Sequence, residues 1–284
     1  MKKLLILFSC VLFAHGAFAW GQKGHDVTAY IAECHLTPEA AEKIDKALNG
    51  HSPVYYANWL DIASHTPEYA YTKTWHYRNV DEGKTIDTMP ENPDGDVLKA
   101  VTTLVAELKA GGLPPEEETL KLKMLIHLVG DMHCPMHAGR LSDIGGNLRP
   151  VLMFGKKTNL HSAWDTAIPE AARKWSYTEW QEQIDRLTDD EAMLIQAGEP
   201  YDWLKETHAL PRRWLHFRGG PHCLSAKDVG KSTIFLRFTK IYVTYNRVGF
   251  VGPEPADLPV AAKPRQLALG IAARIAFDQL HGLV

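Results

Sequence analysis

The spacing of histidine and aspartate in one short stretch constrains this chain most. The stretch runs from His127 to His137 and reads HLVGDMHCPMH. His127 and Asp131 are four residues apart, so on a helix both side chains lie on the same face. An imidazole nitrogen and a carboxylate oxygen at that spacing suit a divalent metal such as zinc. Pro135 disfavours helix at Cys134, so we expect the helix to end there and His137 to project in a new direction.

A second pair with the same spacing follows further along the chain. His161 and Asp165 lie in the segment NLHSAWD. Asp61 in NWLD and His76 in WHY supply one more carboxylate and one more imidazole. A single His–Asp pair is more often a structural hydrogen bond than a metal site, but two pairs with further donors indicate a site for more than one metal ion.

The N-terminus has the features of a secretory signal. A basic start is followed by an apolar run over residues 4–13, and the small residues at 17–19 predict cleavage just before Trp20. A lipoprotein signal with Cys10 as the lipidated residue is the alternative, although the apolar run before it is short for that purpose. We therefore expect residues 1–19 to be removed and the protein to be exported. No later apolar run is long enough to span a membrane.

Cleavage at this point would make Trp20 the first residue of the mature chain, with His25 five positions further on. A free α-amine has an ordinary pKa of about 7.7–8. A metal ion can therefore displace its proton near neutral pH and bind the nitrogen, and the carbonyl of Trp20 could complete a chelate. The new N-terminus and His25 are thus candidate ligands of the same site.

Composition limits the class of protein. The chain has 284 residues, of which 45% are hydrophobic and 23% charged, which fits one large folded domain or two small ones and argues against disorder. The formal net charge is −3, and removal of Lys2 and Lys3 with the leader makes it more negative. A protein that held duplex DNA by its charge alone would be basic. If this chain handles nucleic acid, metal ions must therefore engage the phosphate.

The remaining histidines and cysteines are not assigned to the site. His133 falls two residues after Asp131, away from its helical face, and His208 is expected to have a packing or surface role. An odd number of cysteines remains after the leader, so they cannot all pair within the chain, and the sequence does not reveal which would form a disulfide. They are Cys34, Cys134 and Cys223.

Most of the chain has helical periodicity. Val27, Tyr30, Ile31 and Cys34 form one stripe and predict a first helix. Further helices are predicted over residues 38–48, 96–108, 116–133, 158–175, 178–197 and 266–280. Residues 49–95 are expected to be rich in loops, and the apolar run 151–154 after Gly145 and Gly146 predicts a short hairpin strand. The fold class is therefore mainly α, with a single domain over residues 20–284.

Residues 211–252 differ in character from the rest of the chain. They are rich in Lys and Arg with Asp228 as the one acid, and residues 234–245 are β-branched and aromatic, which predicts strand or irregular structure. Basic and aromatic residues that alternate, such as those around Trp214, could contact nucleic acid. We favour the alternative that the segment is a divergent surface subdomain. A locally altered reading frame is a third explanation of its composition.

Together these residues resemble the S1/P1 nuclease family. The resemblance rests on Trp20, His25 and the segments WLD, WHY, HLVGDMHCPMHA, GGN and NLHSAWD, whose order and spacing match up to about residue 208. It implies a mostly helical fold that holds three zinc ions, in a secreted protein of bacterial type. By position, Asp61, His76, His127 and Asp131 would hold the first ion; His137, His161 and Asp165 the second; and the amine and carbonyl of Trp20, with His25 and a shared Asp131, the third.

The resemblance also implies an activity. It predicts hydrolysis of single-stranded DNA or RNA to 5′-phosphate products, together with 3′-nucleotidase activity, with Asp61 orienting the nucleophile or accepting its proton. Unpaired bases can stack on aromatic side chains, and Tyr77 occupies a position where relatives carry a stacking aromatic, although packing is an equal alternative. Asn147 is a candidate polar contact to substrate. Ser64 departs from the family pattern, because many relatives carry Arg or Lys there.

Two other functions fit parts of the pattern. A zinc-dependent phospholipase C shares the N-terminal Trp and a similar core motif, but those relatives space the first His further from the Trp and end the last pair with Glu. Here His25 is five residues on and Asp165 closes the pair. A zinc-stabilised binding protein without catalysis would enclose its metals fully. The sequence gives no sign of an obligate protein partner.

Overall fold

The computed structural model describes residues 21–153 and 156–214. Several sequence predictions therefore lie outside the described residues: the signal peptide, Trp20, Cys223, most of the 211–252 segment and the helix over 266–280. Among the helices that are described, none combines the length and the apolar character needed to cross a membrane.

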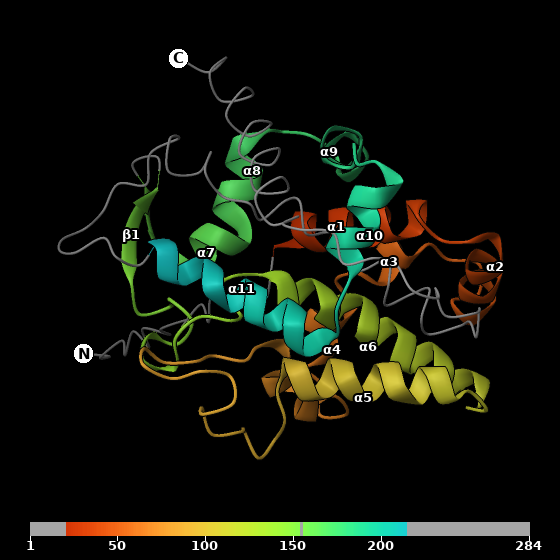
Figure 1. The fold of residues 1–284 in the computed structure, drawn as a ribbon, viewed down its shortest axis with the longest axis horizontal. Helices are drawn as coiled ribbons and strands as arrows, with labels where there is room; N and C mark the ends of the chain where they lie inside the picture. The colour runs from red at the N-terminus through yellow and green to blue at the C-terminus, as the bar shows by residue number, and fades with distance from the viewer. Residues whose placement is uncertain (1–20, 154–155, 215–284) are drawn as a thin grey trace, which may run out of the picture.

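The described chain is mainly helical, as the sequence predicts (Figure 1). Its elements in order are α1 (Gln22–Cys34), α2 (Pro38–Ala47), α3 (Pro53–Tyr56), α4 (Trp59–Ala63), η1 (Ala70–His76), α5 (Val97–Ala110), α6 (Pro115–His133), η2 (Leu141–Asp143), β1 (Pro150–Met153), β2 (Lys156–Asn159), α7 (Leu160–Ser162), η3 (Ala163–Ala167), α8 (Ile168–Ala172), α9 (Tyr177–Ile184), α10 (Asp189–Gln196) and α11 (Pro200–Trp214).

Helix α6 is the central helix of the fold, and α5 packs along it at one edge (Figure 1). Asp96 begins α5 as predicted, because its Oδ1 accepts hydrogen bonds from the backbone N–H groups of Leu98 and Lys99. Three glutamates occupy the first turn of α6, where negative charge is favourable to the helix dipole. The second half of α6 is buried on all sides, so its polar residues face the interior.

Two hydrophobic clusters hold the elements together. The larger one joins α5, α6 and α11, with Leu104, Leu125 and Leu204 among its buried members. The smaller one lies around Met136 and Trp164. Helix α1 contributes buried residues to both clusters, so α1 and the C-terminal end of α6 connect them. Polar residues on these two segments are therefore held in the interior between the clusters.

The predicted hairpin is present. Strands β1 and β2 are antiparallel, with Pro150 opposite Asn159 and Met153 opposite Lys156. The side chain of Asn159 then accepts a hydrogen bond from the backbone of Ser162 and begins α7. The prediction of helix from residue 158 was therefore wrong for its first two residues, because strand pairing extends to Asn159 before its side chain caps the helix.

The predicted helix over 178–197 is divided in two. Helix α9 ends at Ile184, and α10 starts only after Thr188. Thr188 accepts a hydrogen bond from the N–H of Glu191, whose carboxylate accepts one from the N–H of Thr188. This reciprocal cap holds the backbone of Thr188 in an extended conformation, and so a single continuous helix cannot pass through it.

Two further predictions are modified. The loop-rich region 49–95 contains three short helices, α3, α4 and η1. Helix α11 continues to Trp214, so the first four residues of the segment 211–252 are helical and not strand-like. The physical reason is that extending an existing helix adds one hydrogen bond for each residue ordered, whereas starting a strand needs a partner.

A buried arginine fixes the loop before α5. Nη1 of Arg78 donates to Oδ2 of Asp96 at 2.7 Å, and Nη2 donates to the carbonyls of Ile86 at 3.0 Å and Met89 at 2.9 Å. The side chains of Arg78 and Asp96 are only 6% and 8% exposed. One side chain therefore ties the loop to the N-terminus of α5.

We expect Arg78→Met to lower the free energy of unfolding by about 3–5 kcal/mol, because Asp96 would stay buried without its positive partner. Urea unfolding followed by circular dichroism measures the change. The control is Glu82→Gln, which breaks an ion pair to Arg140 whose acid is 72% exposed and should cost less than about 1 kcal/mol. Equal losses in the two variants would contradict the assigned role of Arg78.

Candidate metal centre

Helix α6 carries the first two candidate ligands on one face, as predicted. Nε2 of His127 lies 3.1 Å from Oδ2 of Asp131. The helix ends at His133, and Cys134 adopts an extended backbone (φ −77°, ψ 123°), in agreement with the effect expected of Pro135. The turn that follows brings His137 back towards the helix, so that its Nδ1 lies 3.1 Å from Oδ1 of Asp131.

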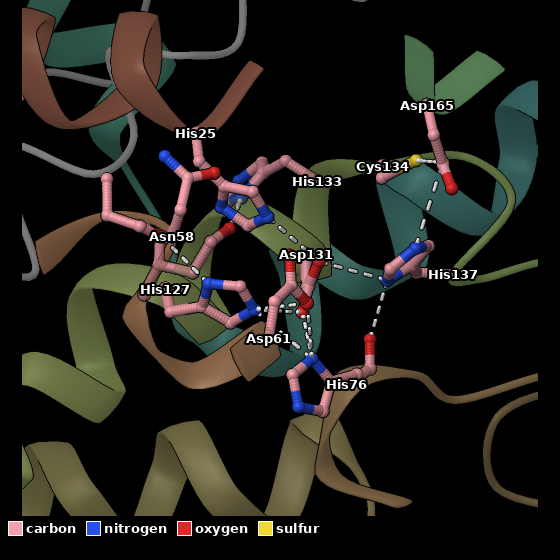
Figure 2. A network of polar contacts seen from close by, with 12 residues as sticks. His25, Asn58, Asp61, His76, His127, Asp131, His133, Cys134, His137 and Asp165 are labelled. Carbon is pink, nitrogen blue, oxygen red and sulfur yellow. Dashed lines mark hydrogen bonds and ion pairs between the residues drawn. The ribbon is translucent and has the colours of Figure 1, made fainter. Parts of the chain in front are cut away.

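Asp131 is the centre of the arrangement (Figure 2). Its side chain is fully buried, and four histidines surround its two oxygens. Besides His127 and His137, Nδ1 of His76 lies 2.8 Å from Oδ2, and Nε2 of His25 lies 3.4 Å from Oδ1. These residues come from α1, η1, α6 and the turn after α6, so four separate segments converge on one carboxylate.

The spacing of one group of donor atoms can be compared with tetrahedral zinc coordination. Ligands about 2.0–2.1 Å from a tetrahedral zinc ion are about 3.3 Å from one another. Nε2 of His127 lies 3.2 Å from Nδ1 of His76 and 3.4 Å from Oδ1 of Asp61. Nδ1 of His76 lies 3.8 Å from the same Asp61 oxygen and, as above, 2.8 Å from Asp131. These distances lie on both sides of the tetrahedral value. The donor atoms of Asp61, His76 and His127 all lie within 4.8 Å of one another, so these three side chains could hold a metal ion.

Backbone carbonyls orient three of the imidazole rings. Nδ1 of His127 donates to the carbonyl of Ala57 at 2.8 Å, Nδ1 of His137 to that of His76 at 2.8 Å, and Nδ1 of His161 to that of Gly145 at 2.8 Å. In a neutral ring this leaves Nε2 with its lone pair, and carbonyl partners of this kind are typical of metal-binding histidines. Each Nε2 atom faces a carboxylate: Asp131 or Asp61 for His127, and Asp165 for the other two.

A second group forms around Asp165. Nε2 of His161 lies 2.9 Å from Oδ2 of Asp165, although the turn between them is a wider π-type turn in η3 and not a regular α-helix. On the other side of the same carboxylate, Nε2 of His137 lies 3.8 Å from Oδ1 and the Cys134 thiol donates to Oδ1 at 3.1 Å. Cys134, His137 and Asp165 hold their donor atoms within 4.8 Å of one another.

The third group contains His25. Its donor atom lies within 4.8 Å of those of His127 and Asp131, and its ring stacks on that of His127 with centroids 4.1 Å apart. Trp20 lies outside the described residues. Its neighbour Gly21 donates a backbone hydrogen bond to the carbonyl of Asp165 at 2.8 Å, so the described chain starts beside a candidate ligand.

The electrostatics of the cluster favour the charged forms of His127 and Asp131 despite burial, and the neutral form of His25. Burial lowers the pKa of His127, yet the carboxylates of Asp131 and Asp61 raise it to about 10. Burial raises the pKa of Asp131, yet His137 and His127 hold it well below its usual value. Burial and the neighbouring His127 lower the pKa of His25. The carboxylate of Asp131 is therefore an anion at neutral pH, the form that a cation binds.

Asp61 is the candidate ligand through which the first group meets solvent. Its side chain is 12% exposed, whereas those of His127 and Asp131 are fully buried. His161 has the same 12% exposure in the second group. The first and second groups are thus not fully enclosed by the described residues, unlike the sites expected of a purely structural zinc protein.

The candidate substrate residues lie at the edge of the centre. Tyr77 directly follows His76 and is half-buried. The side-chain amide of Asn147 donates to the carbonyl of Ile144 at 2.9 Å, a contact within a local turn. Gly145 approaches the site closely, because a Cβ there would lie 3.3 Å from Nδ1 of His161. Ser64 is buried, and its hydroxyl donates to the carbonyl of Asp61 at 3.2 Å.

Two residues that lie near the candidate ligands were not predicted from the sequence to be part of the site. A Cβ at Gly130 would lie 2.7 Å from Nδ1 of His25, so glycine allows α1 to approach α6 here. An isolated glycine inside a helical pattern was the available signal. Cys134 was considered only as a disulfide candidate, yet both it and Cys34 are free. The position of Cys134 between the candidate ligands Asp131 and His137 was the signal available in the sequence.

His133 and His208 are buried but belong to none of the three groups. Nδ1 of His133 donates to the carbonyl of Val129 at 2.7 Å, and Nδ1 of His208 donates to that of Ala138 at 2.7 Å. The ring of His133 also packs near Trp203. These contacts agree with the expectation that His133 points away from the ligand face and that His208 has a packing or surface role.

Comparisons with known proteins agree with the family resemblance of the sequence. Residues 20–235 match the S1/P1 Nuclease family, a range that extends beyond residue 208 and into the basic segment. The chain is 30% identical to Endonuclease 4 of Arabidopsis thaliana over 57% of its own length and 60% of that protein. It is 30% identical to Nuclease S1 of Aspergillus oryzae over 66% and 69% of the two chains. With Nuclease P1 of Penicillium citrinum the identity is 30% over 53% and 58%.

Proposed function

The chain belongs to the S1/P1 nuclease family, and on this premise we propose that it is a zinc-dependent hydrolase of phosphodiester bonds in single-stranded DNA and RNA. The proposed products carry 5′-phosphates, and 3′-nucleotides are proposed as further substrates. The chain spans about 60% of the length of the first relative it matches. The activity of this protein is therefore a proposal, which rests on the family and on the residues of its own site.

The observation that carries the proposal is the convergence of three carboxylates and five imidazoles in one centre, which is partly open to solvent. Among the described residues, three sets of donor atoms each lie within 4.8 Å of one another: His25, His127 and Asp131; Asp61, His76 and His127; and Cys134, His137 and Asp165. We propose three zinc ions, with the ligands given by position in the family. Asp61, His76, His127 and Asp131 would hold the first; His137, His161 and Asp165 the second; and Trp20, His25 and Asp131 the third.

The described residues would have different roles in hydrolysis. When bound, the metal ions would activate water and stabilise the negative charge on the phosphate. Asp61, the most exposed carboxylate of its group, would orient the attacking water and accept its proton. Asp131 holds four imidazoles in fixed positions, and the carbonyls of Ala57 and Gly145 keep two of the rings in their tautomers.

Substrate contacts are proposed at the edge of the centre. Tyr77 would stack on an unpaired base, and Asn147 would contact a polar group of the nucleotide through its Oδ1. A preference for single strands follows, because bases in a duplex are already stacked on each other. Ser64 hydrogen-bonds to the backbone of Asp61, so we expect phosphate to be held by the metal ions and not by a basic side chain at this position.

A substrate panel tests the proposed function. We expect single-stranded DNA to be cleaved about tenfold faster than the duplex of the same sequence or more, since stacking contributes about 1–3 kcal/mol per base. Single-stranded RNA and a 3′-nucleotide should also be hydrolysed, and end analysis should find 5′-phosphates. The matched control is Asp61→Asn, purified in the same way, which should be inactive. Turnover of phosphatidylcholine without release of nucleotides would favour the phospholipase C-like alternative.

We propose that residues 1–19 are a signal peptide, that the protein is exported, and that residues 20–284 form one domain.

The N-terminal amine of Trp20 gives a separate prediction. A short extension left in front of Trp20 should reduce hydrolysis about 10–100-fold, because an amide nitrogen is a much poorer ligand than a free amine. The same extension placed at the C-terminus is the control. Full activity of the N-terminally extended protein would exclude Trp20 as a ligand.

A further inference from the structure

Cys134 occupies a position that the proposed ligand set does not use. It is fully buried at the C-terminal end of α6. Its N–H donates to the carbonyl of Asp131 at 2.9 Å, and its carbonyl accepts from the N–H of His137 at 3.0 Å. The backbone on both sides of the thiol is therefore fixed by hydrogen bonds to candidate metal ligands. The thiol itself points to Asp165, with Sγ 3.1 Å from Oδ1 (Figure 2).

A second observation concerns the imidazole beside it. Nε2 of His137 is buried and makes no hydrogen bond within the described part of the chain. Because Nδ1 donates to the carbonyl of His76, Nε2 carries the lone pair when the ring is neutral. It lies 3.8 Å from Oδ1 of Asp165, and the donor atoms of His137, Asp165 and Cys134 are all within 4.8 Å of one another. A thiol-to-carboxylate hydrogen bond explains the contact of Cys134 but leaves this nitrogen unsatisfied.

We infer that Cys134 is a thiolate ligand of the metal ion held by His137 and Asp165. This inference rests on the proposed function for the presence of an ion, and it adds a sulfur donor to the ligand set given by position. On binding, the sulfur exchanges its bond to hydrogen for a bond to the metal, and the proton leaves to solvent. One cation between the three groups satisfies Nε2 of His137, the Asp165 carboxylate and the buried sulfur together.

The inference gives the second ion a distinct character. His161 borders the same carboxylate, with its Nε2 2.9 Å from Oδ2 of Asp165. The thiolate would distinguish the second ion from the other two, whose proposed ligands are nitrogen and oxygen atoms. Thiolate is also a soft ligand that favours zinc over magnesium or calcium. We therefore expect the second ion to be held more firmly than the ion near Asp61.

Spectroscopy of the cobalt-substituted protein tests the inference independently of activity. Thiolate bound to Co²⁺ absorbs strongly in the near ultraviolet, whereas nitrogen and oxygen ligands do not. We expect this band in the wild type, and we expect its loss in Cys134→Ser together with affinity for one ion weakened more than about 10–100-fold, the effect of removing an outer partner. The matched control is Cys34→Ser, because Cys34 is a free and exposed cysteine, and it should keep the band. A band that persists in Cys134→Ser overturns the inference.

X-ray absorption at the zinc edge covers the case in which the serine variant does not fold, because it uses only the wild type. A sulfur atom at about 2.3 Å from zinc is the expected result, and a shell of nitrogen and oxygen alone overturns the inference. The outcome is separable from that of the proposed function. A sulfur shell in a protein without phosphodiester hydrolysis would refute the nuclease alone, and an active nuclease without zinc-bound sulfur would refute the thiolate alone.

Discussion

Asp131→Asn should reduce kcat/KM on single-stranded DNA by more than about 100-fold, because even partners outside the ligand set of a metal contribute 10–100-fold. The substitution keeps the shape of the side chain and removes the charge that faces four imidazoles. In the proposed assignment it weakens two ions at once. His25→Ala, which removes a ligand of one ion, should therefore cost less. Metal content per chain, measured with the kinetics, should fall in the same order.

The control for this prediction is Asp26→Asn, the same chemical change on the residue next to His25. Asp26 accepts a hydrogen bond from Asn58 at 2.7 Å and belongs to none of the three groups. We expect its kcat/KM to stay within about threefold of the wild type, since surface and partly buried changes of this kind usually have small effects. Equal losses in Asp131→Asn and His25→Ala would argue against a carboxylate shared by two ions.

Removal of metal should abolish hydrolysis and lower the melting temperature. Without cations, the five imidazoles and three carboxylates of the centre are held together only by their own hydrogen bonds and ion pairs. A metal present at a thousand times its dissociation constant stabilises the folded state by about 4 kcal/mol per ion. For a chain of this size, that corresponds to about 8 °C or more per ion. Differential scanning calorimetry before and after chelation measures the shift, and added zinc should reverse it.

The matched control for chelation is Asp131→Asn. With fewer ions bound, its melting temperature should change less on chelation than that of the wild type, although both proteins start from the same fold. A buffer effect of the chelator would shift the two proteins equally. An unchanged melting temperature in the wild type would show that the three groups do not hold tightly bound metal.

Local sequence signals determined much of the fold. Helices were predicted to start near residues 38 and 96, and the structure has them, capped by the side chains of Thr37 and Asp96. The four-residue spacing of His127 and Asp131 predicted their common face, and Pro135 predicted the end of α6. These features depend on backbone geometry over one or two turns, so they can be read without knowing the rest of the fold. The errors, such as the break in 178–197, also came from local caps that were overlooked.

The sequence also determined which residues are candidates for the centre, through their order, their spacing and the resemblance that these carry. It did not determine how they meet. Only the tertiary structure brings His25, His76 and His137 around Asp131, selects the ring nitrogens through carbonyls of distant residues, and turns Cys134 towards Asp165. The physical reason is that these contacts join segments far apart in the chain. Their positions are set by the packing of two hydrophobic clusters, which no short-range periodicity encodes.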